Sequence, residues 1–97
     1  MYEIVFAQEA LKDLMAFRKF EQQIIISNID TQLVHEPMVE TRNRFRMRPN
    51  DVAEWELTID RFRVFYNVTD DDQIVRIEVI GVKRGNQLFV RGTRREL

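Results

Sequence analysis

The spacing of the apolar residues changes partway along this chain, and that change constrains the fold more than any other feature. Up to about residue 35, apolar side chains recur every three or four positions, which is the period of an amphipathic helix. From residue 42 onward they alternate with polar side chains, which is the period of a strand with one buried face. A block of helices followed by a block of strands is typical of α+β proteins, whose helices pack on a sheet.

The first half predicts one strand and two helices. Residues 2–6 are β-branched and aromatic, which favours a strand. A helix follows from Gln8, with Asp13 off the apolar stripe that is formed by Ala10, Leu11, Leu14, Met15 and Phe17. A second helix is predicted for residues 21–35, because Pro37 disfavours a helical residue before it. We expect its buried face to hold Ile25, Ile29 and Leu33, widened by Ile24, Ile26 and Val34.

The second half predicts strands over residues 42–48, 55–59, 62–68 and 75–79, with turns at 49–51, 60–61 and 70–72. Gly81 is expected to end the last of these strands, and residues 88–90 form a short apolar element, helix or strand. We therefore expect a single α+β domain over residues 1–97. It consists of an N-terminal strand and an antiparallel two-helix hairpin, packed on a mainly antiparallel sheet of four to five strands.

Several classes of protein are disfavoured by what the sequence lacks. It has no cysteine, which excludes disulfides and thiolate metal sites. No apolar stretch approaches the roughly 20 residues of a membrane span, and the start carries no basic leader. Glycine-rich phosphate loops, Ser/His/Asp sets and metal-ligand spacings are missing too. We expect a soluble cytoplasmic protein with no membrane, metal or cofactor.

The charge is distributed unevenly along the chain. Residues 1–41 carry three basic and seven acidic side chains, whereas residues 42–97 carry twelve basic and nine acidic ones. An anionic partner is therefore expected to contact the second half. The net charge of −1 is unlike that of a typical basic RNA-binding domain and weighs against RNA as that partner.

Arginine occupies every second position between residues 42 and 48. In an extended chain these side chains point to one side, roughly 7 Å apart, and so match the phosphates of a single nucleic-acid strand. Two alternatives remain open: a solvated strand edge kept charged against aggregation, or a surface for an acidic protein. The four residues are Arg42, Arg44, Arg46 and Arg48.

Arg63 interrupts an otherwise apolar strand, where neighbouring side chains would hold it rigidly. A rigid cation suits the charge that develops on phosphorus in a transition state. The alternative is a cross-strand ion pair with Glu54, Glu56 or Glu78. Lys83 and Arg84 follow Gly81 near a strand end, where functional residues often gather.

Aromatic residues and the one histidine have mostly structural interpretations. Trp55 and Tyr66 fall on the apolar side of their strands and are expected in the core. Phe65 falls on the Arg63 side and is the better platform for stacking on a base. His35 is expected near a helix C-terminus, and the sequence shows no partner that would make it a general base.

The motifs in this order and spacing resemble the RelE/ParE toxins from Tyr2 to about Gly92. The first pieces are Tyr-Glu-Ile-Val-Phe at residues 2–6, His-Glu-Pro at 35–37 and Trp-Glu-Leu-Thr-Ile at 55–59. The most specific are Arg-Phe-Arg-Val-Phe-Tyr at 61–66 and Ile-Gly-Val-Lys-Arg-Gly-Asn at 80–86. The resemblance implies a compact α+β toxin that a cognate antitoxin holds inactive.

The resemblance also implies roles for individual residues. Arg63 matches the strand arginine that stabilises the transition state in the nuclease branch. Lys83 falls at a second basic position after the glycine, with Arg84 as its neighbour. Phe89 falls where many nucleases carry tyrosine or histidine, and it can stack on a base but cannot exchange a proton. Glu54 and Glu56 stand where one nuclease subgroup has lysines. The expected catalytic residues are thus Arg63, Lys83 and Arg84, and the expected substrate-binding residues are Arg44, Arg46, Arg48, Arg61, Phe65 and Phe89.

Three functions are compatible with these observations. The first is an endoribonuclease that cleaves mRNA on the ribosome, with the 2′-hydroxyl attacking the adjacent phosphate and basic residues stabilising the charge. The second is a ParE-type poison of DNA gyrase, favoured by Phe89 and by the lack of an acid–base pair. The third is a toxin-like binding module without catalysis. The nuclease mechanism requires Arg63 and Lys83 to lie close together and not to be locked in pairs with nearby glutamates.

Overall fold

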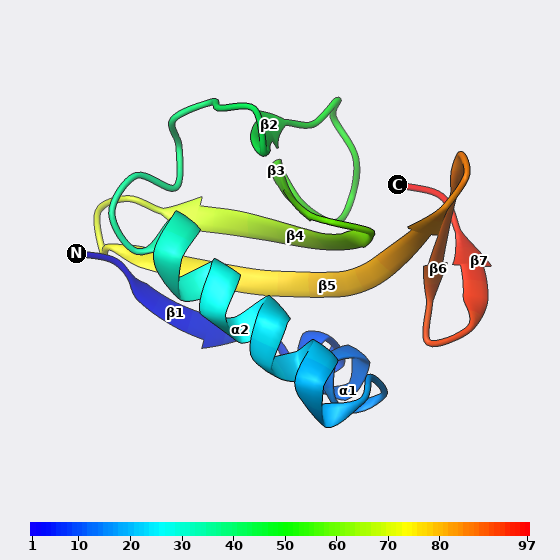
Figure 1. Ribbon diagram of the computed structural model, residues 1–97. Helices are drawn as coiled ribbons and strands as arrows, with labels where there is room; N and C mark the ends of the chain where they lie inside the picture. Colours follow the sequence, from blue (N-terminus) through cyan, green and yellow to red (C-terminus); the bar gives the residue numbers. More distant parts are fainter.

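The computed structural model describes all residues from 1 to 97, in two helices and seven strands (Figure 1). The first half contains β1 (Glu3–Phe6), α1 (Gln8–Met15) and α2 (Lys19–Leu33). The second half contains β2 (Arg44–Arg46), β3 (Trp55–Ile59), β4 (Phe62–Thr69), β5 (Ile74–Arg84), β6 (Gln87–Val90) and β7 (Thr93–Arg95). The predicted α+β architecture is confirmed. Neither helix is long and apolar enough to cross a membrane.

All seven strands belong to one sheet, in the order β2-β3-β4-β5-β6-β7, and β1 joins it through β5. Every neighbouring pair along this order is antiparallel, and β1 alone runs parallel to its partner. The sheet is larger than the expected four to five strands. The strands beyond that number are β6, in the segment left open between helix and strand, and β7, which is only three residues long. Strand β2 covers only the middle of the strand predicted for residues 42–48.

Strand β5 has two different neighbours along one edge. Its first part pairs with β1 up to Ile77, and its last part pairs with β6 from Val82 onward. Gly81 lies inside this strand and does not end it, so the predicted strand end at Gly81 is wrong. A Cβ atom at position 81 would lie 2.8 Å from the carbonyl oxygen of Phe89, so glycine is what lets β6 approach β5 this closely.

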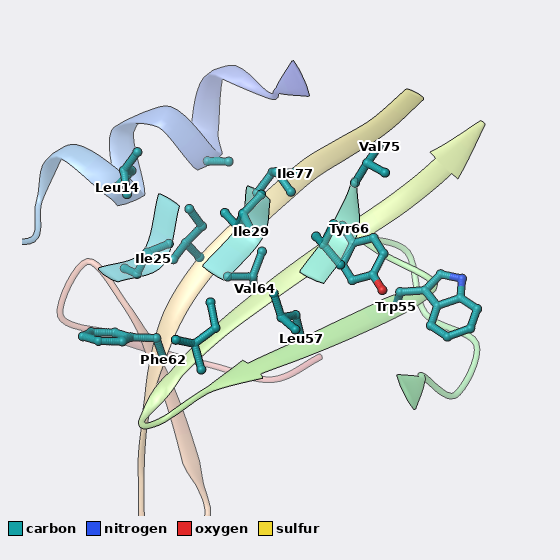
Figure 2. Close-up of a cluster of buried hydrophobic side chains, with 14 of the residues drawn as sticks. Leu14, Ile25, Ile29, Trp55, Leu57, Phe62, Val64, Tyr66, Val75 and Ile77 are labelled. Carbon is teal, nitrogen blue, oxygen red and sulfur yellow. The ribbon is translucent and has the colours of Figure 1, made fainter. Parts of the chain in front are cut away.

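The main core lies between the helices and one face of the sheet (Figure 2). Helix α2 contributes the predicted stripe of Ile25, Ile29 and Leu33, and all three are buried. Trp55 and Tyr66 stack in the same core, as expected. Ile24 and Ile26 were expected to widen this buried face, but they are exposed because they lie on the flanks of a helix that touches the sheet along one line.

The buried position of Asp13 on α1 was not predicted. Its side chain is 1% exposed, although the sequence places it beside an apolar stripe among charged neighbours. One carboxylate oxygen of Asp13 accepts a hydrogen bond of 3.0 Å from the backbone N–H of Ile80. This contact joins α1 to the part of β5 that lies between its β1 and β6 pairings.

Candidate functional site

The face of the sheet opposite the helices carries the charged residues that the sequence singled out most strongly. A second, smaller apolar cluster of Ala53, Phe65, Val79, Leu88 and Val90 lies on this face. Along each strand, the residues between those of the main core point to this opposite face. They include Glu56 on β3, Arg63 on β4 and Lys83 on β5. We call Glu56, Arg63 and Lys83, together with the cavity beside them, the far-face site.

Glu56 and Arg63 form an ion pair at the centre of the far-face site. Arg63 Nε lies 3.4 Å from Glu56 Oε2, and the two side chains are only 18% and 13% exposed, respectively. Arg63 also donates hydrogen bonds from Nη1 to the carbonyl oxygens of Asp60, at 2.7 Å, and Phe62, at 2.9 Å. The alternative reading of Arg63 as half of a cross-strand ion pair is therefore what the structure shows. Arg63 is not a free cation, so the condition that the expected nuclease mechanism placed on it, freedom from nearby glutamates, is not met.

The Glu56 carboxyl has an unusual electrostatic setting. Burial raises its pKa, because water no longer solvates the ionised form, and attraction to Arg63 and Lys83 offsets only part of that effect. Lys83 itself lies within 4 Å of no carboxylate. A carboxylate with a raised pKa is a stronger base than an exposed one, and a nearby lysine can stabilise negative charge.

A cavity of about 360 Å³ opens next to this group. Its lining includes Glu56, Phe65, Lys83, Leu88, Arg94 and Arg95. With Glu96, which also lines it, the cavity has three cationic and two anionic side chains. A second hollow around residues 45–50 shares Glu56, Met47 and Leu97 with it and is lined by Arg46 and Arg48. The two hollows therefore adjoin each other.

The structure divides the expected site residues between two faces of the sheet. Lys83 and Arg84 are neighbours on β5, so their side chains point to opposite faces. Arg84 and Phe89 line a cavity of about 490 Å³ on the helix side, together with Arg61. The Arg84 guanidinium lies 5.2 Å from the centre of the Phe89 ring. The expectation that Arg84, Arg61 and Phe89 share a site with Lys83 is wrong.

The helix-side cavity is largely neutralised by its own residues. Arg61 pairs with the buried Glu21, and Arg91 pairs with Asp13. Both carboxylates line the same cavity as the two arginines. Of the three arginines that line the helix-side cavity, Arg84 alone has no carboxylate within 4 Å. Charge compensation of this kind stabilises the junction between the helices and the sheet.

The predicted row of aligned arginines does not form. Strand β2 covers only residues 44–46, and Arg44 is 8% exposed. Its guanidinium donates to the carbonyl oxygens of Val39, at 3.1 Å, and Gln32, which ties the loop after α2 to the sheet. The prediction that Arg44 binds substrate is wrong for this reason. Arg46 lies 3.5 Å from Glu54 and 5.7 Å from the centre of the Trp55 ring, whereas Arg48 is exposed.

Phe65 lies on the predicted face but is buried. It is 2% exposed and packs in the smaller apolar cluster, so it forms the floor of the cavity and offers no free ring face for stacking. The sequence reasoning missed Arg94 and Arg95, because the last residues show no periodic pattern. It also gave Glu56 no functional role, although hairpin geometry around residues 60–61 places Glu56 diagonally opposite Arg63.

Comparisons with known proteins agree with the geometry of the fold. The family model described as the ParE toxin of type II toxin–antitoxin systems, parDE, matches residues 4–88. No curated protein is similar enough in sequence to count as a match.

Solved structures with the same fold are distant in sequence. The toxin–antitoxin complex RelBE2 from Mycobacterium tuberculosis contains a chain with a TM-score of 0.73 and 18% identity, and the match covers 84% of this chain and 98% of that one. The archaeal RelE–RelB complex from Pyrococcus horikoshii contains a chain with a TM-score of 0.68 and 19% identity, and the match covers 87% of this chain and 96% of that one. The isolated RelE toxin of E. coli has a TM-score of 0.69 and 17% identity, and the match covers 87% of this chain and 86% of that one. At these identities the likeness establishes the fold alone.

Proposed function

The chain belongs to the ParE toxin family of type II toxin–antitoxin systems, within the RelE/ParE superfamily, and on this premise we propose that it is an endoribonuclease acting at the far-face site. One observation carries the proposal. Glu56 is a mostly buried carboxylate of raised pKa that lies beside two cations and lines a cavity shared with Arg94 and Arg95. Groups with strongly shifted pKa values in a cavity are frequent catalytic acids and bases.

The proposed reaction is transfer of the phosphodiester to the ribose 2′-oxygen. Glu56 accepts the proton of the 2′-hydroxyl as that oxygen forms a bond to phosphorus, and the bond from phosphorus to the 5′-oxygen breaks. The products are a 2′,3′-cyclic phosphate and a 5′-hydroxyl, which takes a proton from Lys83 or from water. In this mechanism Arg63 acts on Glu56, because its Nε lies 3.4 Å from the Glu56 carboxylate and its Nη1 donates to two carbonyl oxygens.

Other cations in the proposed site bind the backbone of the substrate. Lys83, Arg94 and Arg95 surround the cavity and hold the phosphate that reacts. Arg46 and Arg48 line the adjoining hollow and contact the next phosphates along the strand. This assignment keeps Lys83 as a catalytic residue and replaces Arg84 by Glu56.

The partners of the proposed nuclease are mRNA on the ribosome and a cognate antitoxin. The solved RelBE2 and RelE–RelB structures are toxin–antitoxin complexes, which supports an antitoxin for this chain as well. An antitoxin that places acidic side chains over Lys83 and Arg95 would neutralise the charges that the RNA needs.

Expression of matched variants tests the proposal. The wild type, Glu56→Gln and Lys83→Ala are induced separately, and cuts in cellular mRNA are mapped by primer extension. We expect cuts for the wild type and about 100-fold fewer for Glu56→Gln, which has no base. Arg76→Ala removes an exposed cation of β5 outside the cavity and should cut like the wild type. Equal cutting by Glu56→Gln and the wild type would exclude Glu56 as the base.

A second candidate is a toxin that poisons DNA gyrase without cleaving RNA. Two observations favour it: Arg63 is held by Glu56, and Phe89, which has no hydroxyl, points to the helix side. Induction of the DNA-damage response by the wild type, with no cuts in mRNA, would support gyrase as the target. Toxicity of Glu56→Gln equal to that of the wild type would agree with this outcome.

A further inference from the structure

The last two strands form a small hairpin that has few connections to the rest of the sheet. Strand β6 pairs with β5 over three residue pairs, and β7 pairs with β6 alone. In Figure 1 this hairpin projects at one end of the molecule, beyond the long strand β5. Two-stranded hairpins of this size are marginally stable on their own, and terminal segments are poorly ordered unless they are tied down.

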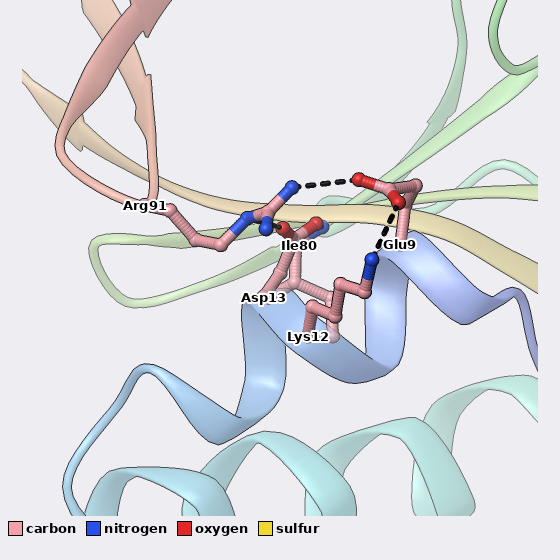
Figure 3. A network of polar contacts seen from close by, with 5 residues as sticks. All are labelled: Glu9, Lys12, Asp13, Ile80 and Arg91. Atoms are coloured by element: carbon pink, nitrogen blue, oxygen red, sulfur yellow. Dashed lines mark hydrogen bonds and ion pairs between the residues drawn. The ribbon is translucent and has the colours of Figure 1, made fainter.

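Arg91, in the turn of this hairpin, reaches back to helix α1 (Figure 3). Its Nη2 donates to Glu9 Oε1 at 2.7 Å, and its Nε lies 2.9 Å from Asp13 Oδ1. The Arg91 backbone has a φ of 48°, a left-handed conformation that is uncommon outside glycine. The chain thus turns in a way that arginine disfavours, at a position whose side chain contacts α1.

Asp13 links this contact to the centre of the sheet. Ile80 lies in the stretch of β5 between its pairings with β1 and β6, and its N–H donates to Asp13 Oδ2 at 3.0 Å. Asp13 Oδ1 has no well-directed hydrogen bond, so the nearby Arg91 guanidinium is what compensates its charge. A carboxylate buried to this degree is costly without a cation.

We propose that Asp13 and Arg91 are positioning residues that hold the β6–β7 hairpin against α1, and with it Arg95 and Arg94 at the far-face site. Arg95 is paired with Leu88 across the hairpin, and both line the cavity next to Lys83. A hairpin released from α1 would be held only by its three residue pairs with β5. It could then move relative to β5 and take Arg94 and Arg95 out of the cavity. The expected effect on RNA cleavage rests on the proposed function, whereas the tether of the hairpin to α1 does not.

Two variants and a matched control test the tether without RNA. Arg91→Met removes both contacts and keeps the length of the side chain, and Asp13→Asn keeps the acceptor for Ile80 but loses the charge. Lys12→Ala removes a 3.4 Å contact to Glu9 on the same helix and leaves the hairpin tether intact. Amide hydrogen exchange is followed by NMR. We expect residues 87–95 to exchange about tenfold faster in both variants, with β3 and β4 unchanged, and Lys12→Ala to match the wild type.

RNA provides the second readout. With the loosened hairpin we expect about tenfold slower cleavage of an mRNA bound to ribosomes, mostly through a raised KM, because binding of the phosphate is lost and Glu56 is untouched. Unchanged hydrogen exchange in Arg91→Met and Asp13→Asn would overturn the tether. Faster exchange with unchanged cleavage would overturn its role in positioning and leave the proposed nuclease intact.

A wild type that cleaves no RNA refutes the proposed function instead. In that case the side-chain NMR signals of Arg94 and Arg95 still report whether the tether places them. We expect both signals to shift and broaden in Arg91→Met but not in Lys12→Ala. Unchanged signals in both would refute the placement by itself.

Discussion

Glu56 on β3 and Arg63 on β4 lie diagonally across neighbouring strands, with 3.4 Å between Glu56 Oε2 and Arg63 Nε. The pair decides which chemistry the far-face site can perform. An arginine held by a carboxylate and two backbone carbonyls cannot turn toward a phosphate without losing those contacts. The same contact holds Glu56 beside the cavity, where the proposed mechanism uses it as the base.

Substitution of Glu56 by glutamine should change how stability depends on pH. The folded-state pKa of Glu56 is raised, mainly by burial, so the folded state favours its protonated form. The stability that it contributes is full below the unfolded pKa of about 4.3 and is lost as pH rises through the higher folded pKa. Relative to the wild type, Glu56→Gln should therefore become progressively more stable between pH 4 and pH 7.

Urea unfolding at several pH values measures this difference, and Glu54→Gln is the control, because Glu54 lies on the same strand side but is exposed. A Glu56→Gln difference that stays constant from pH 4 to pH 7 would contradict the raised pKa. The cleavage rate of the wild type should rise with pH through the pKa of Glu56. Any residual cleavage by Glu56→Gln should not show this rise.

Lys83→Ala and Arg84→Ala separate the two faces of the sheet. The residues are adjacent and both cationic, but Lys83 lines the far-face cavity and Arg84 lines the helix-side cavity. We expect Lys83→Ala to lower RNA cleavage by about 100-fold, as loss of a group that stabilises a transition state typically does. Arg84→Ala should stay within a few-fold of the wild type. Similar losses in the two variants would place the substrate across both faces, contrary to the proposed site.

Arg44→Ala should affect folding and not RNA binding. Its guanidinium is buried and satisfies the carbonyl oxygens of Val39 and Gln32, so removal leaves two polar groups without partners. We expect a loss of about 2–4 kcal/mol in the free energy of unfolding. Arg48→Ala, at an exposed position of the same segment, should change stability by less than about 0.5 kcal/mol and weaken RNA binding instead. Thermal and urea unfolding compare the two, and equal stabilities would contradict the anchoring role of Arg44.

Gly81→Ala should destabilise the protein by forcing β6 away from β5. The new methyl group would lie 2.8 Å from the Phe89 carbonyl oxygen, a backbone atom that cannot move alone. We expect a cost of about 2–3 kcal/mol from this overpacking. Gly85 is the control, because its φ of 63° disfavours alanine while nothing lies within 4 Å of an added methyl. Gly85→Ala should cost about 1 kcal/mol and leave hydrogen exchange in β6 unchanged, whereas Gly81→Ala should accelerate it.

Tyr66→Phe tests how the segment after α2 is held to the sheet. The buried Tyr66 hydroxyl donates to the carbonyl oxygen of Pro37 at 2.6 Å. Without it that carbonyl is left unpaired in the interior, at a cost of about 1–3 kcal/mol. Tyr2→Phe removes a comparable bond to Asp70 at an exposed site, where water replaces it, and should be nearly neutral. A smaller effect at Tyr66 than at Tyr2 would mean that the segment is not anchored here.

Local patterns in the sequence determined most of the secondary structure and the choice of core faces. Helical spacing identified Ile25, Ile29 and Leu33, and strand alternation placed Trp55 and Tyr66 in the core and Arg63 on the opposite face. These predictions succeed because burial of one face of a helix or strand makes apolar residues recur along the sequence with the period of that backbone. The motifs at residues 61–66 and 80–86 determined the family by the same local means.

Only the tertiary structure decided which charges are free and which are compensated. Arg44, Arg63 and Arg91 look alike in sequence, yet one anchors a loop, one holds Glu56 and one tethers a hairpin. Asp13 looks like a surface residue and is buried against Ile80. The physical reason is that an ionised side chain can be buried only where a partner from a distant segment meets it, and that meeting depends on how the strands and helices are assembled.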